Sequence, residues 1–158
     1  MNCRARICRF SIVLDLDIRP AQADDLAALE WLGLFERDRH LIRSAFGAQE
    51  RGDALLLLAI AGGFPLAQVW IDFARKPGTA VFWAVRTFPP LEGRGIGSRM
   101  LAAAEAEVRR RRLDRAELEV ERDNTRARRF YQRRGWRLVA DAQAQPTGPE
   151  LLVMAKAL

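Results

Sequence analysis

The chain is 158 residues long, with 49% hydrophobic residues, 29% charged residues and a formal net charge of +6. This length fits one domain, and the composition is that of a globular protein with a buried core, so it excludes disordered and fibrous chains. The longest stretch without a charged residue, Ala54–Ile71, approaches the length of a membrane span, but Gly62, Gly63 and Pro65 interrupt it. We interpret it as two buried strands joined by a turn.

The N-terminal segment does not have the pattern of a targeting sequence. Met1–Arg9 is basic, but the apolar run behind it, Phe10–Leu14, is too short for the core of a signal peptide. We therefore expect a cytoplasmic protein without a membrane partner, in which residues 1–14 form a disordered tail and residues 15–158 form one domain.

Cysteine and histidine are scarce. Cys3 and Cys8 both lie in the tail without a CxxC spacing, and His40 is the only histidine. These counts argue against a zinc site, a disulfide framework and any bound metal. A Ser-His-Asp hydrolase is not favoured either, because no serine lies in a G-x-S-x-G turn.

The charge is distributed unevenly along the chain. Residues 94–137 contain 14 arginines against 7 acidic residues, whereas residues 15–72 contain 5 arginines against 10 acidic residues. This asymmetry predicts one surface that attracts a polyanion and another that attracts a cation. The simpler alternative is that the arginines cover solvated helix faces.

The first half of the chain predicts helices next to a sheet. A short strand over 16–20 precedes a helix that begins after Asp24 and carries Leu26, Leu29 and Leu32 on one face. A second helix is expected over 37–50. Strands are expected over 55–60, 66–73 and 79–87, the first two joined as a hairpin.

The second half alternates between the two element types. Helices are expected over 95–112 and 125–134, the latter ended by Gly135, and strands over 115–120, 136–139 and 151–155. The complete order, β-α-α-β-β-β-α-β-α-β-β, predicts an α/β fold with a mixed central β-sheet flanked by helices.

A glycine-rich segment, Glu92–Ser98, lies between a predicted strand and a predicted helix. Its G-x-G-x-G pattern lets the backbone approach a ligand, and the free N–H groups of a helix N-terminus bind anions. It lacks the glycine spacing of a dinucleotide site and the lysine of an NTPase phosphate loop. The alternative is a plain turn from strand to helix.

A second segment, Leu118–Trp136, reads LEVERDNTRARRFYQRRGW. This segment resembles a motif of the GNAT superfamily of acyl-CoA N-acetyltransferases. The shared pattern is a strand, an Asn, an Ala three residues later, a Phe-Tyr pair and then Gly with an aromatic residue. The upstream glycine segment resembles the pyrophosphate loop of that family, and the two motifs together cover residues 85–136. The resemblance implies the GNAT fold and an N-acetyltransferase domain over residues 15–158.

The resemblance also implies acetyl-CoA as the cosubstrate. The strand end Val85, Arg86 and Thr87 would hold the pantetheine arm through its backbone, much as a peptide adds to a sheet edge. Asn124 would bind the same arm, and its alternative role is a helix N-cap. The residues expected around the phosphates are Gly93, Arg94, Gly95, Ile96, Gly97, Ser98 and Arg99.

Two residues match catalytic positions of the family. Tyr131, the only tyrosine, would protonate the departing thiolate, with packing under the sheet as its alternative role. Glu119 matches the glutamate of the ribosomal-protein-alanine acetyltransferases and would act as the base, but it could also be an outward strand residue, leaving Asp72 or water as the base. Glu92 and Thr87 depart from the family pattern, and a carboxylate at position 92 would repel a pyrophosphate unless it points away.

The acceptor implied by the resemblance is a primary amine of a small molecule or peptide. We expect a cationic or amine-bearing acceptor to enter over the acidic half, residues 15–72, and we expect no nucleic-acid partner and a monomer or homodimer. The alternatives are a peptide N-terminal acetyltransferase, a non-catalytic coenzyme A-binding domain and a nucleic-acid-binding module.

Overall fold

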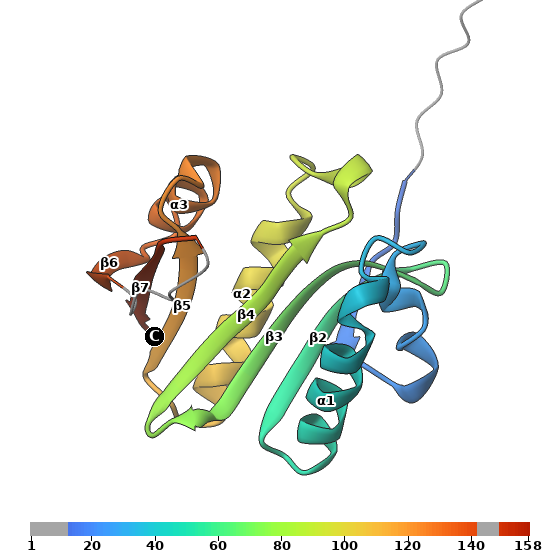
Figure 1. Cartoon of the computed structure of the whole chain (residues 1–158), viewed down its shortest axis with the longest axis horizontal. Coiled ribbons are helices and arrows are strands. Elements are labelled where there is room, and N and C mark those ends of the chain that lie inside the picture. Colours follow the sequence, from blue (N-terminus) through green and yellow to red (C-terminus); the bar gives the residue numbers. More distant parts are fainter. Residues whose placement is uncertain (1–12, 142–148) are drawn as a thin grey trace, which may run out of the picture.

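The computed structural model describes residues 13–141 and 149–158, and it contains one seven-stranded sheet with helices on both faces (Figure 1). The predictions for most of the N-terminal tail, with Cys3 and Cys8, lie outside the described residues. The strands lie in the order β1-β2-β3-β4-β5-β7-β6. The predicted α/β fold with a mixed central sheet is therefore confirmed.

The strands form where the apolar patterns predict them. Their bounds are β1 Asp17–Pro20, β2 Ala54–Ala61, β3 Phe64–Lys76, β4 Thr79–Thr87, β5 Arg115–Glu121, β6 Arg137–Asp141 and β7 Leu151–Ala157. The helices are α1 Arg39–Glu50, α2 Ile96–Arg110 and α3 Thr125–Gln132, with short 3₁₀ turns over 23–25, 28–30, 36–38 and 89–91. No helix among the described residues combines the length and the apolar composition that crossing a membrane requires.

Most neighbouring strands pair antiparallel, and β4 with β5 is the parallel pair. A parallel pair needs a long crossover, and α2 supplies it between these two strands. The carboxyl ends of β4 and β5 therefore lie at the same edge of the sheet, and the chain leaves them toward α2 and α3 (Figure 1).

Each face of the sheet carries its own hydrophobic core. On one face α2 packs Met100, Leu101 and Ala104 against β2 to β5. On the other face α1 contributes Ile42 and Ala45 to a smaller core. Figure 1 shows α1 in front of the sheet and α2 behind it.

The prediction of a helix after Asp24 is wrong. Residues 23–30 form two 3₁₀ turns, and the chain then reverses at Trp31 and Leu32, whose φ angles are 46° and 60°. Left-handed backbone at two successive residues ends any helical run. Leu29 is buried as expected, but Leu32 is exposed, so the apolar spacing there does not reflect one helix face.

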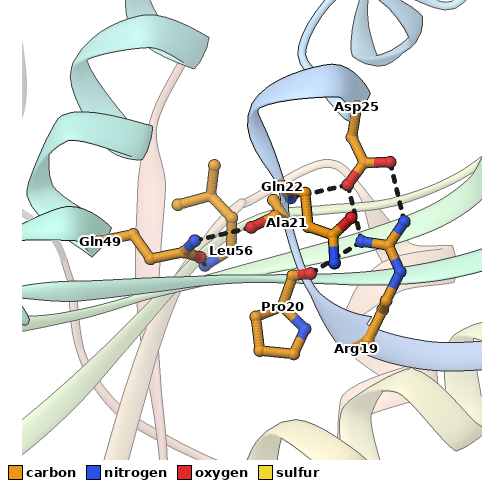
Figure 2. Close-up of polar contacts among 7 residues, drawn as sticks. All are labelled: Arg19, Pro20, Ala21, Gln22, Asp25, Gln49 and Leu56. Atoms are coloured by element: carbon orange, nitrogen blue, oxygen red, sulfur yellow. Dashed lines mark hydrogen bonds and ion pairs between the residues drawn. The ribbon is translucent and has the colours of Figure 1, made fainter.

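The corner after β1 is held by polar contacts around Asp25 (Figure 2). Two guanidinium nitrogens of Arg19 donate to its carboxylate at 2.7 and 3.0 Å, and the backbone N–H of Gln22 donates at 2.7 Å. From α1, Gln49 donates to the carbonyl of Ala21 at 2.9 Å and accepts from the N–H of Leu56 at 2.8 Å. These bonds fix the segment before α1 to the sheet.

We expect Asp25→Asn to lower the free energy of unfolding by about 1–3 kcal/mol at pH 7, because it breaks a buried, charge-assisted pair. The hydrogen bond from Arg19 lowers the pKa of Asp25. A lowered pKa stabilises the fold above the ordinary carboxyl value of about 4, and the contribution is lost as the pH falls through the folded value. Urea unfolding at pH 7 and pH 3 measures both effects.

Asp24, the exposed residue next to Asp25, provides the control substitution. Asp24→Asn should change the unfolding free energy by less than about 0.5 kcal/mol at either pH. Equal effects of the two substitutions at pH 7 would show that the Arg19 pair does not stabilise this corner.

Candidate functional site

The sheet opens between β4 and β5. Only Ala80–Phe82 pairs with β5, through Ala116–Leu118, and beyond these residues the two strands diverge (Figure 1). β4 also bulges: two of its residues, Ala84 and Val85, oppose one residue of β3, and Ala84 has a φ angle of 46°. The backbone of residues 83–87 therefore has no strand partner on the β5 side.

A cavity of about 670 Å³ lies at this opening. Its walls come from the end of β4, the loop and first turn of α2, α3, strand β3 and the segment before α1. The predicted site residues that line it are Val85, Arg86, Thr87, Gly93, Gly95, Ile96, Gly97, Ser98, Asn124 and Tyr131. The strand end, the glycine segment and the Asn-Tyr segment thus meet at one place, as the resemblance implied.

The glycines of the loop have distinct roles. Gly95 begins α2 with a φ angle of 83°, a conformation that side chains with a Cβ rarely adopt. Gly97 is close-packed, because a Cβ there would lie 3.3 Å from the Thr87 hydroxyl and 3.6 Å from the Phe130 ring. Glycine at position 97 therefore lets the first turn of α2 lie close to β4 and α3, and any larger residue there would have to displace the Thr87 side chain.

Glu92 does not face the cavity as a free carboxylate. Its Oε2 accepts a hydrogen bond from Arg126 of α3 at 2.7 Å, so the charge at this position is paired. The contact joins the glycine loop to α3 across the mouth of the cavity. The departure from the family pattern at position 92 is thus offset by Arg126.

Arg134 makes a second connection across the cavity. It donates to the Ser98 hydroxyl of α2 and to the carbonyl of Phe130 at 2.9 Å, and its guanidinium lies 3.9 Å from the centre of the Phe130 ring. With Arg126 and Arg133, it places three cations on the α3 side of the cavity. This wall suits a polyanion.

Asn124 caps α3. Its side-chain oxygen accepts a hydrogen bond from the N–H of Ala127 at 3.0 Å. The alternative role as an N-cap is therefore present, and its amide also lines the cavity.

Tyr131 lies on the inner face of α3 with its ring buried against Phe130 and Trp136, at centroid distances of 5.2 and 6.0 Å. Its hydroxyl forms no hydrogen bond with the other described residues, and the side chain lines the cavity. Burial raises the pKa of Tyr131 to about 12. The phenol therefore stays protonated at neutral pH and is available as a donor.

Four predicted residues lie away from the cavity wall. Arg94 and Arg99 are exposed beside the loop. Glu119 is exposed on β5, 3.6 Å from Arg75, in a separate hollow of about 420 Å³. Asp72 accepts hydrogen bonds from two backbone N–H groups just after it, at the irregular part of β3 between Asp72 and Lys76. Among the described residues no group of three His, Cys, Asp or Glu side chains could hold a metal ion.

The cavity also contains residues that the sequence analysis missed. Arg126, Phe130 and Arg133 repeat at helical spacing on α3, a signal that could have identified one lined face. Gln68 is the single polar residue in Phe64–Ile71, the apolar part of β3, which is also a detectable signal. Trp31 and Phe35 follow an irregular backbone, so no periodicity marks them.

The comparisons with known proteins agree with this geometry. The sequence profile described as the acetyltransferase (GNAT) family matches residues 12–136, well over half of the chain. No curated protein sequence matches the chain significantly.

Several solved structures have the same fold. The PaiA N-acetyltransferase from Thermoplasma acidophilum, in complex with coenzyme A, is 20% identical with a TM-score of 0.69, over 92% of this chain and 100% of that one. The ribosomal-protein-alanine N-acetyltransferase from Escherichia coli is 18% identical with a TM-score of 0.74, over 90% and 94%. An acetyltransferase from Salmonella typhimurium that modifies the N-terminal serine of a 50S ribosomal subunit protein is 19% identical with a TM-score of 0.76, over 90% and 95%.

These similarities show the fold, whereas the family profile concerns the sequence itself. It spans the diverging strands, the glycine loop and α3, which are the elements that build the cavity. The chain belongs to the acetyltransferase (GNAT) family and is an acetyl-CoA-dependent acyltransferase.

Proposed function

We propose that the protein transfers an acetyl group from acetyl-CoA directly to a primary amine that binds on the opposite side of the sheet. One observation carries this proposal: residues from both faces of the sheet line a single cavity at the carboxyl end of β4, where β4 and β5 diverge, and Tyr131 lies in its wall. Two ligands can therefore meet within one cavity without a covalent enzyme intermediate, since proximity supplies much of the rate gain.

The residues on the α2 and α3 side fit the cosubstrate. The unpaired backbone of β4 around Val85 offers hydrogen bonds to an amide-bearing arm. The N-terminus of α2 at Gly95 and the arginines of α3 offer donors and positive charge to phosphates. Bound acetyl-CoA supplies an activated thioester carbonyl.

Direct transfer balances as follows. The amine nitrogen attacks the carbonyl carbon, the C–N bond forms, the C–S bond breaks, and the nitrogen loses one proton. Tyr131 donates a proton to the departing sulfur, a step that its protonated phenol permits. Glu92, the one described carboxylate that lines the cavity, is paired with Arg126, so we propose water as the acceptor of the proton from the amine. Glu119→Gln tests the competing base that the family resemblance implies.

The direct test of the proposal is binding followed by turnover. Acetyl-CoA should raise the melting temperature, because a ligand that binds only the folded state stabilises it, whereas duplex DNA should not. Thiol release should then follow addition of amines from a panel of small molecules and peptides. Acetyl-CoA binding without thiol release from any amine would favour a coenzyme A-binding domain that lacks catalysis, and a salt-sensitive DNA complex alone would favour a nucleic-acid-binding module.

We expect Gly97→Val to abolish the shift in melting temperature that acetyl-CoA produces. A Cβ at this position would lie 3.3 Å from the Thr87 hydroxyl and 3.6 Å from the Phe130 ring, so the valine methyl groups would displace these two side chains of the cavity wall. Gly47→Val in α1 is the matched control, because the nearest atom to a Cβ there is a flexible arginine end at 3.6 Å. A folded Gly97→Val protein that binds acetyl-CoA normally would show that the loop is misassigned.

We expect Tyr131→Phe to lower kcat by ~10²–10⁴-fold with little change in the KM for acetyl-CoA. The ring and its contacts with Phe130 and Trp136 remain, and only the proton donor is removed. Because the pKa of Tyr131 is about 12, the wild-type rate should not fall from pH 7 to pH 10 through loss of this proton.

The controls separate catalysis from packing. An acyl donor with a better leaving thiol should reduce the defect, because it depends less on protonation. A lowered melting temperature with unchanged kcat would instead assign Tyr131 a packing role only.

A further inference from the structure

The cavity continues past β4 to the face of the sheet that carries α1. There its lining consists of Trp31, Phe35, Gln68 and Arg86. This part lies on the other side of β4 from the arginines of α3, so it is the place for the acceptor under the proposed function. Its chemistry differs from that of the α3 side, because it contains one arginine and one buried amide where the α3 side contains three arginines.

Arg86 is held in this region with little hydrogen bonding. Its guanidinium lies 4.0 Å from the centre of the Phe35 ring, and the nearest carboxylate, Asp38, is 3.7 Å away, beyond hydrogen-bond distance. The described residues accept no hydrogen bond from the guanidinium. Burial lowers the pKa of Arg86 from its very high ordinary value, but the group stays charged.

Gln68 stands opposite Arg86 on the neighbouring strand. Its side chain is only 2% exposed, and its carbonyl oxygen accepts from the indole N–H of Trp70 at 3.2 Å. That contact orients the amide, and the NH₂ group has no acceptor among the described residues. The buried indole N–H of Trp31, which also lines the cavity, likewise has no partner.

This part of the cavity therefore offers two donors that lack acceptors among the described residues, the guanidinium of Arg86 and the NH₂ group of Gln68, whereas the indole N–H of Trp31 is covered by other atoms. Buried donors without partners are costly, so such a set favours a ligand rich in acceptor oxygens. A carboxylate is acceptor-only, and the guanidinium fork binds it through two parallel hydrogen bonds. The described acidic residues of this region are all paired: Asp25 with Arg19, Glu30 with Arg39, and Asp38 with Arg86 itself through a long contact of 3.7 Å.

We propose that the acceptor is an amine that also carries a carboxylate, with an apolar or aromatic body against Trp31 and Phe35, and that Arg86 binds its carboxylate. This inference rests on the proposed function and narrows it. It also differs from the expectation, drawn from the sequence, that the site selects a cationic acceptor by charge attraction. Arg86 would repel an acceptor that carries only positive charge.

Three matched amines test the proposal: phenylalanine, phenylalanine amide and phenethylamine. With the full-length wild type and saturating acetyl-CoA, kcat/KM should be about 10–100-fold higher for phenylalanine than for the other two amines. This ratio is the one expected from a charge-assisted hydrogen bond to the carboxylate. Arg86→Gln should remove this preference through KM. The pantetheine arm is expected to contact only the backbone at position 86, so the shift in melting temperature by acetyl-CoA serves as the check that this variant keeps its fold and its cosubstrate site. Arg86→Lys should restore part of the preference. Arg51→Gln, at a surface pair with Asp53, should change neither the preference nor this shift.

Binding gives a readout that does not need turnover. With coenzyme A present, the shift in melting temperature produced by phenylalanine should exceed that produced by its amide, and Arg86→Gln should abolish the difference. Equal binding and equal kcat/KM of acid and amide in the wild type would overturn the inference, and that comparison does not depend on the folding of any variant. If the wild type acetylates all three amines equally, the carboxylate preference is refuted and the proposed acetyltransferase function remains. If it binds phenylalanine in preference to its amide but releases no thiol with any amine, the proposed acetyltransferase function is refuted and the carboxylate preference remains.

Discussion

The separation of β4 from β5 is the constraint on which the rest of the site depends. β4 lies in the middle of the seven strands, yet residues 83–87 pair only with β3. An inner strand normally has partners on both sides. The halves of the sheet remain joined elsewhere, because buried Glu105 of α2 accepts from Trp136 at 3.0 Å and from Lys156 at 2.7 Å. The gap can therefore stay open without dividing the domain.

The bulge in β4 determines which side chains of this strand point to each face of the sheet. Phe82 packs in the core under α2, so strict alternation would point residues 84 and 86 to the same face. The extra residue reverses this order: Arg86 reaches Phe35 on the α1 face, while Thr87 contacts the position of Gly97 on the α2 face. One inserted residue thus moves a cation from the α2 face of the sheet to the α1 face.

The same bulge marks where sequence reasoning stops. The strands of 54–87 follow from apolar runs bounded by glycine turns, and the glycine loop with Asn124 and Tyr131 follows from motifs whose spacing is local. The faces of Gln68 and Arg86 depend on cross-strand register, which no single segment encodes. The failed helix after Asp24 has a similar cause, because the reversal at Trp31 is set by tertiary packing.

The net charge within the cavity influences the pKa of the amine, which must be deprotonated before it can attack. Arg86, Arg126, Arg133 and Arg134 line it, against Glu92 as the one described carboxylate. A positive environment disfavours a further cation, so it lowers the pKa of a bound ammonium and raises the fraction present as the neutral nucleophile. Phosphates and a carboxylate bound under the proposed function would neutralise part of this charge, so only the arginine charge that stays unpaired favours the neutral amine. This reduces the demand for a dedicated carboxylate base, consistent with water as the proton acceptor and with the position of Glu119 in a separate hollow.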